Sequence, residues 1–392
     1  MLTAGALNDL GARLASAAGP NPPPAWDGGF DPLPDDADAG LILHVKHQAL
    51  LRCYQARYVL LPDAAPGRSL LDHLAAHYGE DRLRALSNVR GVLEDELIVP
   101  LQAEAATGDV TAYVERLLPE LRAVGSDPFL DALAGLTHRE DHYRNFLVQS
   151  SADLLAEASA SALGVIGEFG APQSALFRIL IDEFGYGAHG HKHSVLYQAT
   201  MRSFGLDDRY NGYWRLFDTH TLVLHNAIHW LFQNPRNIFR QVGFLLFAET
   251  AYQRSTLFHA RYVGRFHPQA DARYFAEHAH IDLHHTQMVV DEVIAPFLER
   301  FGPEVGREMI AGAELTRAVF ARNGAGQLAL LQAFEAAPSA IYGLRPHGGR
   351  LVTPATPVAP AARVQVGAIG AVSAADFHRF PAGATGRLTE AA

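Results

Sequence analysis

Apolar residues recur every three to four positions from Leu41 to Ala337, and strict alternation of apolar and polar residues is almost absent over this range. A repeat close to 3.6 residues gives a helix one apolar face, whereas a repeat of two residues would predict strands. The pattern therefore predicts an all-α protein whose helices bury their apolar faces against one another. The helices predicted after residue 140 cover residues 142–169, 174–184, 194–205, 211–232, 240–263 and 272–301 and a closing segment from Pro303 to about Ala337.

Changes in composition divide the chain into three predicted regions. Residues 1–125 form an N-terminal helical region, in which the Pro-, Gly- and Asp-rich segment 19–40 is expected to be an irregular connector or an arm packed on a neighbour, as in a homodimer. Residues 126–337 form the main helical domain. Residues 338–392 are rich in Pro, Gly, Ala and Val and are expected to be an irregular C-terminal tail with only short extended segments.

Charge and apolar run length exclude several classes of function. The 32 Lys and Arg residues stand against 42 Asp and Glu, a net charge of −10, and no basic cluster interrupts this balance, so nucleic acid is not an expected partner. No run reaches about 18 apolar residues, so no membrane span is predicted. Cys53 is the one cysteine, which excludes internal disulfides and thiolate-rich metal sites. Together with an N-terminus that lacks the pattern of a secretory signal, this predicts a cytoplasmic protein.

The 20 histidines are unusually many, and the segment EHAHIDLHH concentrates them. At 100° per residue, His278, Asp282 and His285 point into one sector of about 60° on a helix, whereas His280 and His284 point to the opposite side. An imidazole, a carboxylate and a second imidazole on one inward face need polar partners, and a metal ion would supply them. We therefore expect these three residues to be metal ligands.

A second candidate pair is Glu183 and His193, which flank a glycine-rich stretch. On a continuous helix they would lie about 15 Å apart, too far to bind one ion. Either the chain folds back at Gly185, Gly187 and Gly190, or the two residues face different ions.

The same stretch contains a formal GxGxxG pattern at residues 185–190, followed by Asp207 and Asp208. A dinucleotide site needs a strand before this pattern and a second strand after the following helix. Residues 174–184 have helical spacing instead, and residues 211–233 are also predicted to be helical. The pattern is therefore not expected to bind a dinucleotide.

Two further carboxylates lie on apolar helices. Glu249 is surrounded by apolar residues and needs a cation, a metal ion or a hydrogen-bond network, with Arg240 and Arg254 as local salt-bridge alternatives. Glu157 lies in an Ala-rich segment, where exposure to solvent is an equally good explanation.

The spacing of His225 and His229 lacks the intervening Glu of a zinc-protease motif. These two histidines are expected to pack in the core or behind the metal ligands.

The strongest candidates are three carboxylates and three imidazoles, drawn from at least three helices. Oxygen and nitrogen donors without thiolate suit iron or manganese, and six donors are too many for one ion with an open position. Two metal ions are therefore expected, and a reduced carboxylate-bridged diiron site would use O₂ for an oxidation.

These residues, in the pattern EFGxG with His193 ten positions after Glu183, then Glu249, then HxxxDxxH from His278 to His285, resemble the haem-oxygenase-like diiron oxidases, also called iron-containing redox enzymes. The resemblance covers roughly residues 126–337. It implies a haem-oxygenase-like bundle of about seven core helices, two Fe(II) ions per chain, O₂ as co-substrate and electrons from an external reductase or chemical reductant. Members that N-oxygenate amines carry an additional glutamate, and Glu157 stands at that place.

The resulting hypothesis is a non-haem diiron oxygenase or oxidase that acts on a small amine, amino acid or carboxylic acid in natural-product metabolism. N-oxygenation is preferred over oxidative C–C cleavage because of Glu157. The alternative is a non-catalytic helical protein that binds metal for storage or sensing. An apolar pocket beside the metal-binding face, with a polar anchor for the substrate, would distinguish the enzyme from the alternative.

Overall fold

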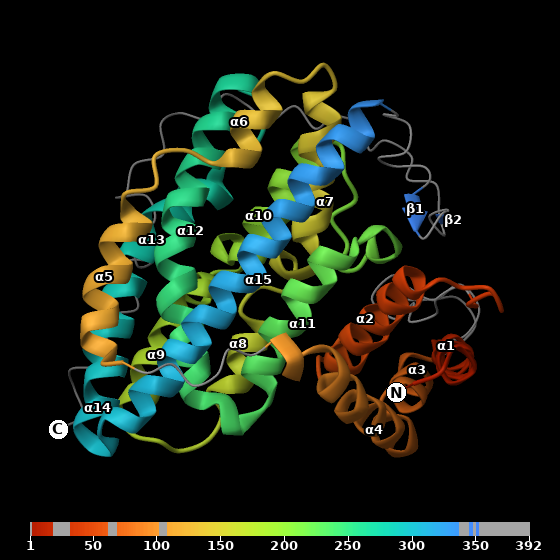
Figure 1. Ribbon diagram of the computed structural model, residues 1–392, viewed down its shortest axis with the longest axis horizontal. Coiled ribbons are helices and arrows are strands. Elements are labelled where there is room, and N and C mark those ends of the chain that lie inside the picture. The colour runs from red at the N-terminus through yellow and green to blue at the C-terminus, as the bar shows by residue number, and fades with distance from the viewer. Residues whose placement is uncertain are drawn as a thin grey trace.

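The computed structural model describes residues 2–18, 32–61, 69–101, 108–336, 345–347 and 350–352. Over this part of the chain the fold is all-α, as predicted, apart from one small hairpin (Figure 1). The helices are α1 (Ala4–Ala18), α2 (Ala39–Gln55), α3 (Leu70–His77), α4 (Glu80–Leu97), α5 (Val110–Arg122), α6 (Pro128–Ala134), α7 (Arg139–Leu154), α8 (Ser159–Gly164), α9 (Ala171–Glu183), α10 (His193–Ser203), α11 (Thr219–Gln233), α12 (Ile238–Phe266), α13 (Arg273–Met288), α14 (Ala295–Phe301) and α15 (Pro303–Ala336).

The core of the bundle is built around α12, which packs along α13 on one side and α15 on the other. The crossing of α12 with α15 is very close because two glycines allow the backbones to touch. A Cβ atom at Gly243 would overlap the carbonyl of Met309, and a Cβ atom at Gly312 would overlap the carbonyl of Arg240. Any larger residue at either position would force the two helices apart.

The N-terminal helices α1 to α4 lie beside the bundle, and α5 lies on its other side (Figure 1). The most extensive contact with the bundle is made by α2, which packs between α11 and α4 and is buried over most of its surface. Arg90 of α4 adds hydrogen bonds to Gln233 and Asn234 at the end of α11. In contrast, α5 packs directly against α12 and α15. Most of segment 19–40 and of the predicted tail lies outside the described residues, and the described part of the tail is an antiparallel pair of strands, β1 (Arg345–His347) and β2 (Arg350–Val352).

Two predicted helices are interrupted. The helix expected over residues 142–169 ends at Leu154 and resumes as α8, because Ala158 adopts a left-handed conformation with φ 63°. The helix expected from residue 211 begins only at Thr219, where Asp218 accepts a hydrogen bond from the backbone N–H of Thr221 at 2.8 Å. The aromatic residues before Asp218 are buried in irregular structure, so their apolar spacing was misleading.

The helix predicted over residues 272–301 is also modified. It contains a π-helical stretch, Val289–Ile294, between α13 and α14. A π-helical turn rotates the following residues relative to a regular helix, and such turns occur often near functional sites. None of the described helices is long and apolar enough to cross a membrane.

Candidate metal centre

Helix α13 presents three of the predicted ligands to the interior. His278, Asp282 and His285 are at most 5% exposed, whereas His284 is exposed and stacks edge-on against His280. The helical phase predicted from the sequence is therefore confirmed. Between the ligands, Leu283 and His284 are exposed, whereas Ile281 is buried with the three donors.

The chain folds back between Glu183 and His193, which settles the alternative that the sequence left open. Glu183 Oε2 lies 2.6 Å from His193 Nδ1. The reversal needs a glycine at position 185, where φ is +71° and a Cβ atom would overlap the backbone of Lys192. The GxGxxG pattern forms two short 3₁₀ turns with no neighbouring strand among residues 108–336, so the structure has no dinucleotide fold there.

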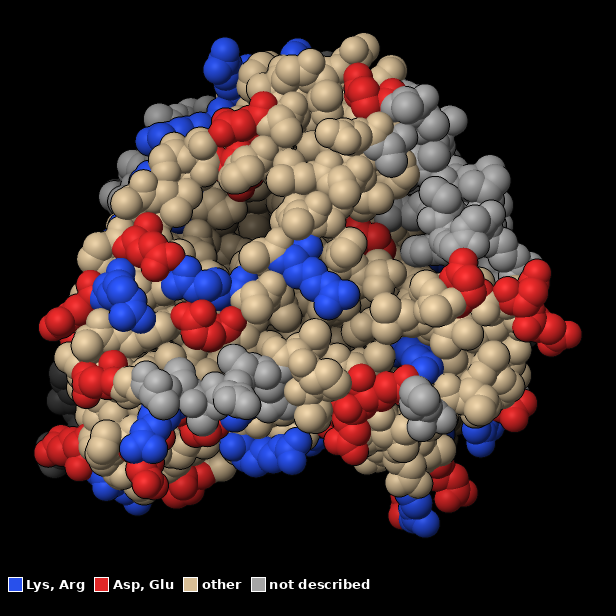
Figure 2. Space-filling model, in the orientation of Figure 1, with Lys and Arg blue, Asp and Glu red and all other residues tan. Residues whose placement is uncertain are grey.

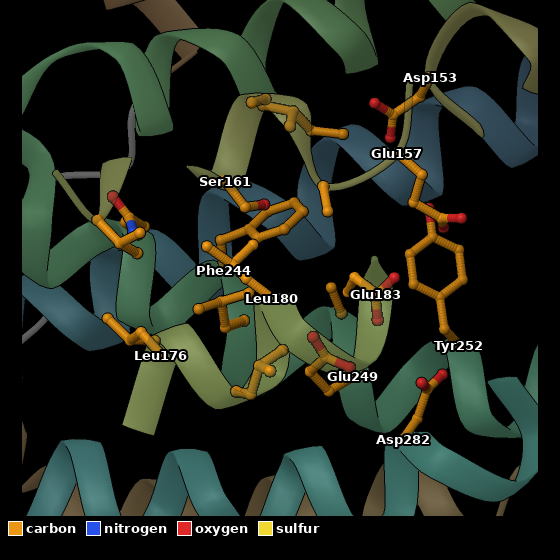
Figure 3. Close-up of a pocket in the computed structure, with 18 of the residues that line it drawn as sticks. Asp153, Glu157, Ser161, Leu176, Leu180, Glu183, Phe244, Glu249, Tyr252 and Asp282 are labelled. Atoms are coloured by element: carbon orange, nitrogen blue, oxygen red, sulfur yellow. The ribbon is translucent and has the colours of Figure 1, made fainter. Parts of the chain in front are cut away.

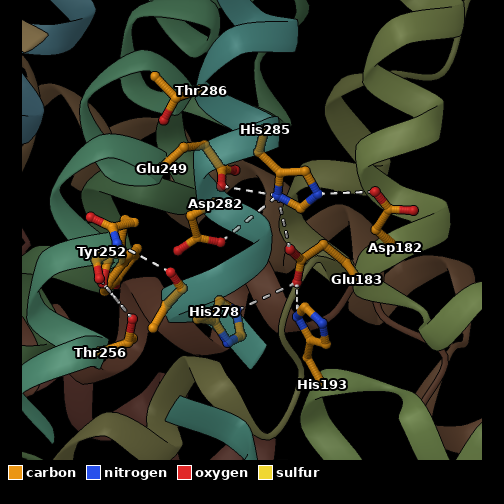
Figure 4. Close-up of polar contacts among 12 residues, drawn as sticks. Asp182, Glu183, His193, Glu249, Tyr252, Thr256, His278, Asp282, His285 and Thr286 are labelled. Atoms are coloured by element: carbon orange, nitrogen blue, oxygen red, sulfur yellow. Dashed lines mark hydrogen bonds and ion pairs between the residues drawn. The ribbon is translucent and has the colours of Figure 1, made fainter. Parts of the chain in front are cut away.

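Glu249 points from α12 toward the same place, with Oε2 3.2 Å from His285 Nδ1 (Figure 4). The local salt-bridge alternatives are wrong, because Arg240 pairs with Glu308 and Arg254 donates to the carbonyl of Val124. Glu249 therefore contacts the interior cluster of donors and not a local arginine.

Glu157 lies in the turn between α7 and α8, just before the left-handed Ala158, and it also faces inward. Its Oε1 atom accepts a hydrogen bond of 2.7 Å from the Tyr274 hydroxyl and lies 3.3 Å from His278 Nε2. The solvent-exposed alternative for Glu157 is therefore wrong.

The donors form two overlapping groups. Atoms of Glu157, Glu183, His193 and His278 lie within 4.8 Å of one another, and so do atoms of Glu183, Asp282 and His285. Glu183 belongs to both groups, and Glu249 contacts the second through His285. A carboxylate shared by two donor groups is the arrangement that a bridged pair of metal ions requires.

Buried atoms without partners show that this cluster suits metal cations. Both carboxylate oxygens of Asp282, which is 1% exposed, have no hydrogen-bond partner among the described residues. Burial raises the pKa of Asp282 well above its ordinary value, so this group stays a carboxylate only when a cation binds it. Hard oxygen donors with imidazole nitrogens fit iron or manganese.

The electrostatics of the metal-free cluster lead to the same conclusion. Burial lowers the pKa of His278 and of His285, but the surrounding carboxylates outweigh burial and raise both pKa values well above the ordinary value. Burial raises the pKa of Glu183, but the three imidazoles around it bring it down to about 2. The His278 and His285 imidazoles therefore hold protons that a metal ion would displace.

Comparisons with known proteins identify the segment that carries these donors. Residues 144–321 match the family model of iron-containing redox enzymes, and all seven predicted ligands lie within this match. This segment belongs to the iron-containing redox enzyme family. The chain is also 35% identical over 227 residues to a nitrosourea synthase from Streptomyces achromogenes subsp. streptozoticus. That alignment covers 57% of the chain and 47% of the relative, so the chain spans about half the length of this relative.

Three further residues lie at the cluster and were not predicted. Asp182 Oδ2 lies 3.2 Å from His285 Nε2, the ring nitrogen that faces away from Glu249. Tyr274 holds Glu157, as described above. Asp153 lines the space beside Glu157, and burial together with the charges of Glu157 and Glu183 raises its pKa to about 7. Tyr274 lies one helical turn before His278 on α13, which was a usable signal, whereas α7 ends between Asp153 and Glu157.

A small chamber of about 80 Å³ opens beside the ligands. Figure 3 shows its carboxylates at one end and apolar side chains of α9 and α12 along its length. We call this space the metal-side chamber, and its carboxylates are those of Asp153, Glu157, Glu183, Glu249 and Asp282.

A second space, of about 520 Å³, lies on the other side of Tyr252. Its lining includes aromatic side chains of α6, α7, α12, α13 and α15, among them Phe146 and Phe320, and also residues of α11. Figure 2 shows a deep hollow in this face of the molecule, beside α12 and below α6 in the orientation of Figure 1. Tyr252 borders both spaces and Tyr274 borders the larger one, so the two tyrosines stand between the larger cavity and the ligands.

Proposed function

We propose that this protein is a non-haem diiron oxygenase that uses O₂ to oxidise a small amine. The observation that carries the proposal is the position of Glu183, which is shared by two donor groups beside an apolar chamber. A storage or structural site would be closed or fully exposed, whereas an oxygenase needs room for substrate next to its metal ions.

The proposed ligands are those predicted from the sequence. Glu157, His193 and His278 would hold one iron, Asp282, His285 and Glu249 would hold the other, and Glu183 would bridge them. Two Fe(II) ions would supply the electrons that reduce O₂. Asp182 would orient the His285 ring and Tyr274 would orient the Glu157 carboxylate, which keeps each donor directed at its ion.

N-oxygenation is the preferred reaction for two reasons. Glu157 lies within the cluster and adds a carboxylate to the donors. The relative's name assigns it the synthesis of a nitrosourea, a product that contains an oxidised nitrogen. In the proposed reaction one oxygen atom of O₂ enters an N–H bond of the amine to give N–OH, and the second oxygen atom leaves as water. An external reductase or chemical reductant supplies the two electrons, and two protons are taken up from solvent.

Anaerobic titration with Fe(II), followed by mixing with O₂ and a panel of amines, tests the proposal. We expect close to two Fe(II) per chain, an antiferromagnetic pair by Mössbauer spectroscopy, and an amine product that has gained one oxygen atom. Iron binding without O₂ consumption for any amine would favour the non-catalytic alternative. If no iron binds in buffer without chelators, both the oxygenase proposal and the non-catalytic metal-binding alternative fail.

A further inference from the structure

The far end of the metal-side chamber carries a buried polar group that has no role in the metal centre. Gln241 lines the chamber and is 2% exposed, and its Nε2 atom has no hydrogen-bond partner among the described residues. Its amide lies against α8 at a position where Gly164 leaves the necessary space, since a Cβ atom there would overlap the amide. A buried amide without a partner is unfavourable, and a bound molecule would satisfy it.

Gln241 and the proposed ligand Glu249 both line the chamber from α12, eight residues apart along the helix and about 80° apart around it. Eight helical residues rise about 12 Å, so the two side chains leave the helix about that far apart along its axis. Coordination of Glu249 to an iron takes about 2 Å and a hydrogen bond to Gln241 takes about 3 Å. The remaining distance of about 7 Å fits an extended chain of about six bonds.

The chamber is small, at about 80 Å³, and this volume includes the space between the carboxylates of the proposed metal centre. It therefore suits only a small molecule, whose length is limited by the helical spacing.

The lining also determines the charge of the ligand. Aliphatic and aromatic side chains, including Leu180, Phe244 and Leu245, form the wall between the two ends. The described lining contains no Lys or Arg, so a carboxylate at the Gln241 end would be buried without a cation. A neutral carbonyl oxygen would instead accept a hydrogen bond from the Gln241 amide at no such penalty.

We propose that Gln241 anchors the uncharged end of the substrate, an aliphatic amine of about seven heavy atoms that ends in a neutral carbonyl group. This inference rests on the proposed function, because it places the amine at the carboxylate end of the chamber. It narrows the substrate class by disfavouring free amino acids and carboxylic acids.

Three probes of similar length test the anchor: 4-aminobutanamide, 4-aminobutanoate and pentylamine. Calorimetric titration under anaerobic conditions, with both metal-free and Fe(II)-loaded full-length protein, should show the amide binding about tenfold more tightly than the other two. Gln241→Leu should remove this preference and leave iron stoichiometry unchanged. Gln327→Leu, in the larger cavity, is the matched control and should retain the preference.

The variant Gln241→Asn keeps the amide and shortens it by one methylene, so the best probe should change to 5-aminopentanamide. A purely structural role of Gln241 would not move the length preference.

Equal or tighter binding of the carboxylate, an amide preference that survives Gln241→Leu, or no binding of any probe at millimolar concentration would overturn the proposal. If iron does not bind but metal-free protein shows the Gln241-dependent preference, the anchor stands and the proposed function fails. If iron binds but the amide preference is absent, the proposed function stands and the Gln241 anchor fails.

Discussion

The face of α13 that carries His278, Asp282 and His285 is regular helix, whereas Glu157 and the Glu183–His193 pair stand where helices end or the chain reverses. On α13, the spacing of residues determines which side chains share a face. At the breaks, the same side chains meet only because particular backbone conformations bring them together. The donors from α13 should therefore respond to loss of a side chain, and the donors at the breaks to changes in the backbone.

The largest effect is expected on α13. Asp282→Ala and His285→Ala each remove a donor, so iron stoichiometry should fall from about two to about one per chain and O₂ consumption should stop. Elemental analysis and an oxygen electrode measure both. The neighbouring change His284→Ala is the control, because His284 is exposed, and it should be nearly silent. Equal losses of iron and of O₂ consumption in His284→Ala and His285→Ala would contradict the assignment of ligands by helical spacing on α13.

The next effect tests the chain reversal. Gly185→Ala combines a positive φ with backbone overlap at Lys192, so His193 should lose its place and iron affinity should fall together with stability, by about 1–3 kcal/mol. Chemical unfolding and Fe(II) titration check these outcomes.

Two neighbouring glycines provide graded controls for this change. Gly187 has φ +79° but no atom near its Cβ position, and Gly190 has neither constraint. Gly187→Ala should therefore show only the conformational strain, and Gly190→Ala should show neither effect. A Gly185→Ala variant with normal iron binding would mean that His193 does not depend on the reversal.

The pH dependence of Fe(II) binding should report the protonation of the histidine ligands. The pKa values of His278 and His285 are raised in the metal-free protein, so both imidazoles are protonated at neutral pH and must lose protons to bind metal. Apparent Fe(II) affinity should rise with pH, by up to about tenfold per pH unit for each proton released.

The sign for the metal-free fold is the opposite. Groups with raised pKa values stabilise the folded state at low pH, and this stabilisation is lost as pH rises through those values. Titration of released protons in weak buffer measures the first effect and thermal unfolding measures the second. Iron affinity that does not change with pH would contradict the assignment.

The smallest effect concerns Glu157. Tyr274→Phe removes the hydroxyl that donates to Glu157, and iron affinity should fall by about tenfold while the fold stays intact. The control is Tyr262→Phe, since the Tyr262 hydroxyl has no hydrogen-bond partner among the described residues. Equal iron affinities for the two variants would show that Tyr274 does not position the carboxylate.

The difference between the halves also explains what the sequence could reveal. The inward face of α13, the burial of Glu249 and the all-α class follow from helical periodicity, because 100° per residue needs no knowledge of neighbours. The interruption at Ala158 could not be read in the same way, since alanine favours helix and its left-handed conformation is imposed by packing. Likewise the glycines between Glu183 and His193 permitted a reversal without specifying its direction.

The contact between the backbones of α12 and α15 has a mechanical consequence for the metal centre. Gly243 lies between Gln241 and Glu249 on α12. Its close contact with the backbone of Met309 therefore holds α12 at one rotation and one axial position. A slip of a single residue would turn Glu249 through about 100° and move it about 1.5 Å along the axis, away from His285. Helix α15 contributes none of the seven proposed ligands, yet its contact with α12 fixes the position of one of them, Glu249. Bulk introduced at Gly312, far along the chain from any ligand, would therefore be transmitted to the chemistry as a change of alignment.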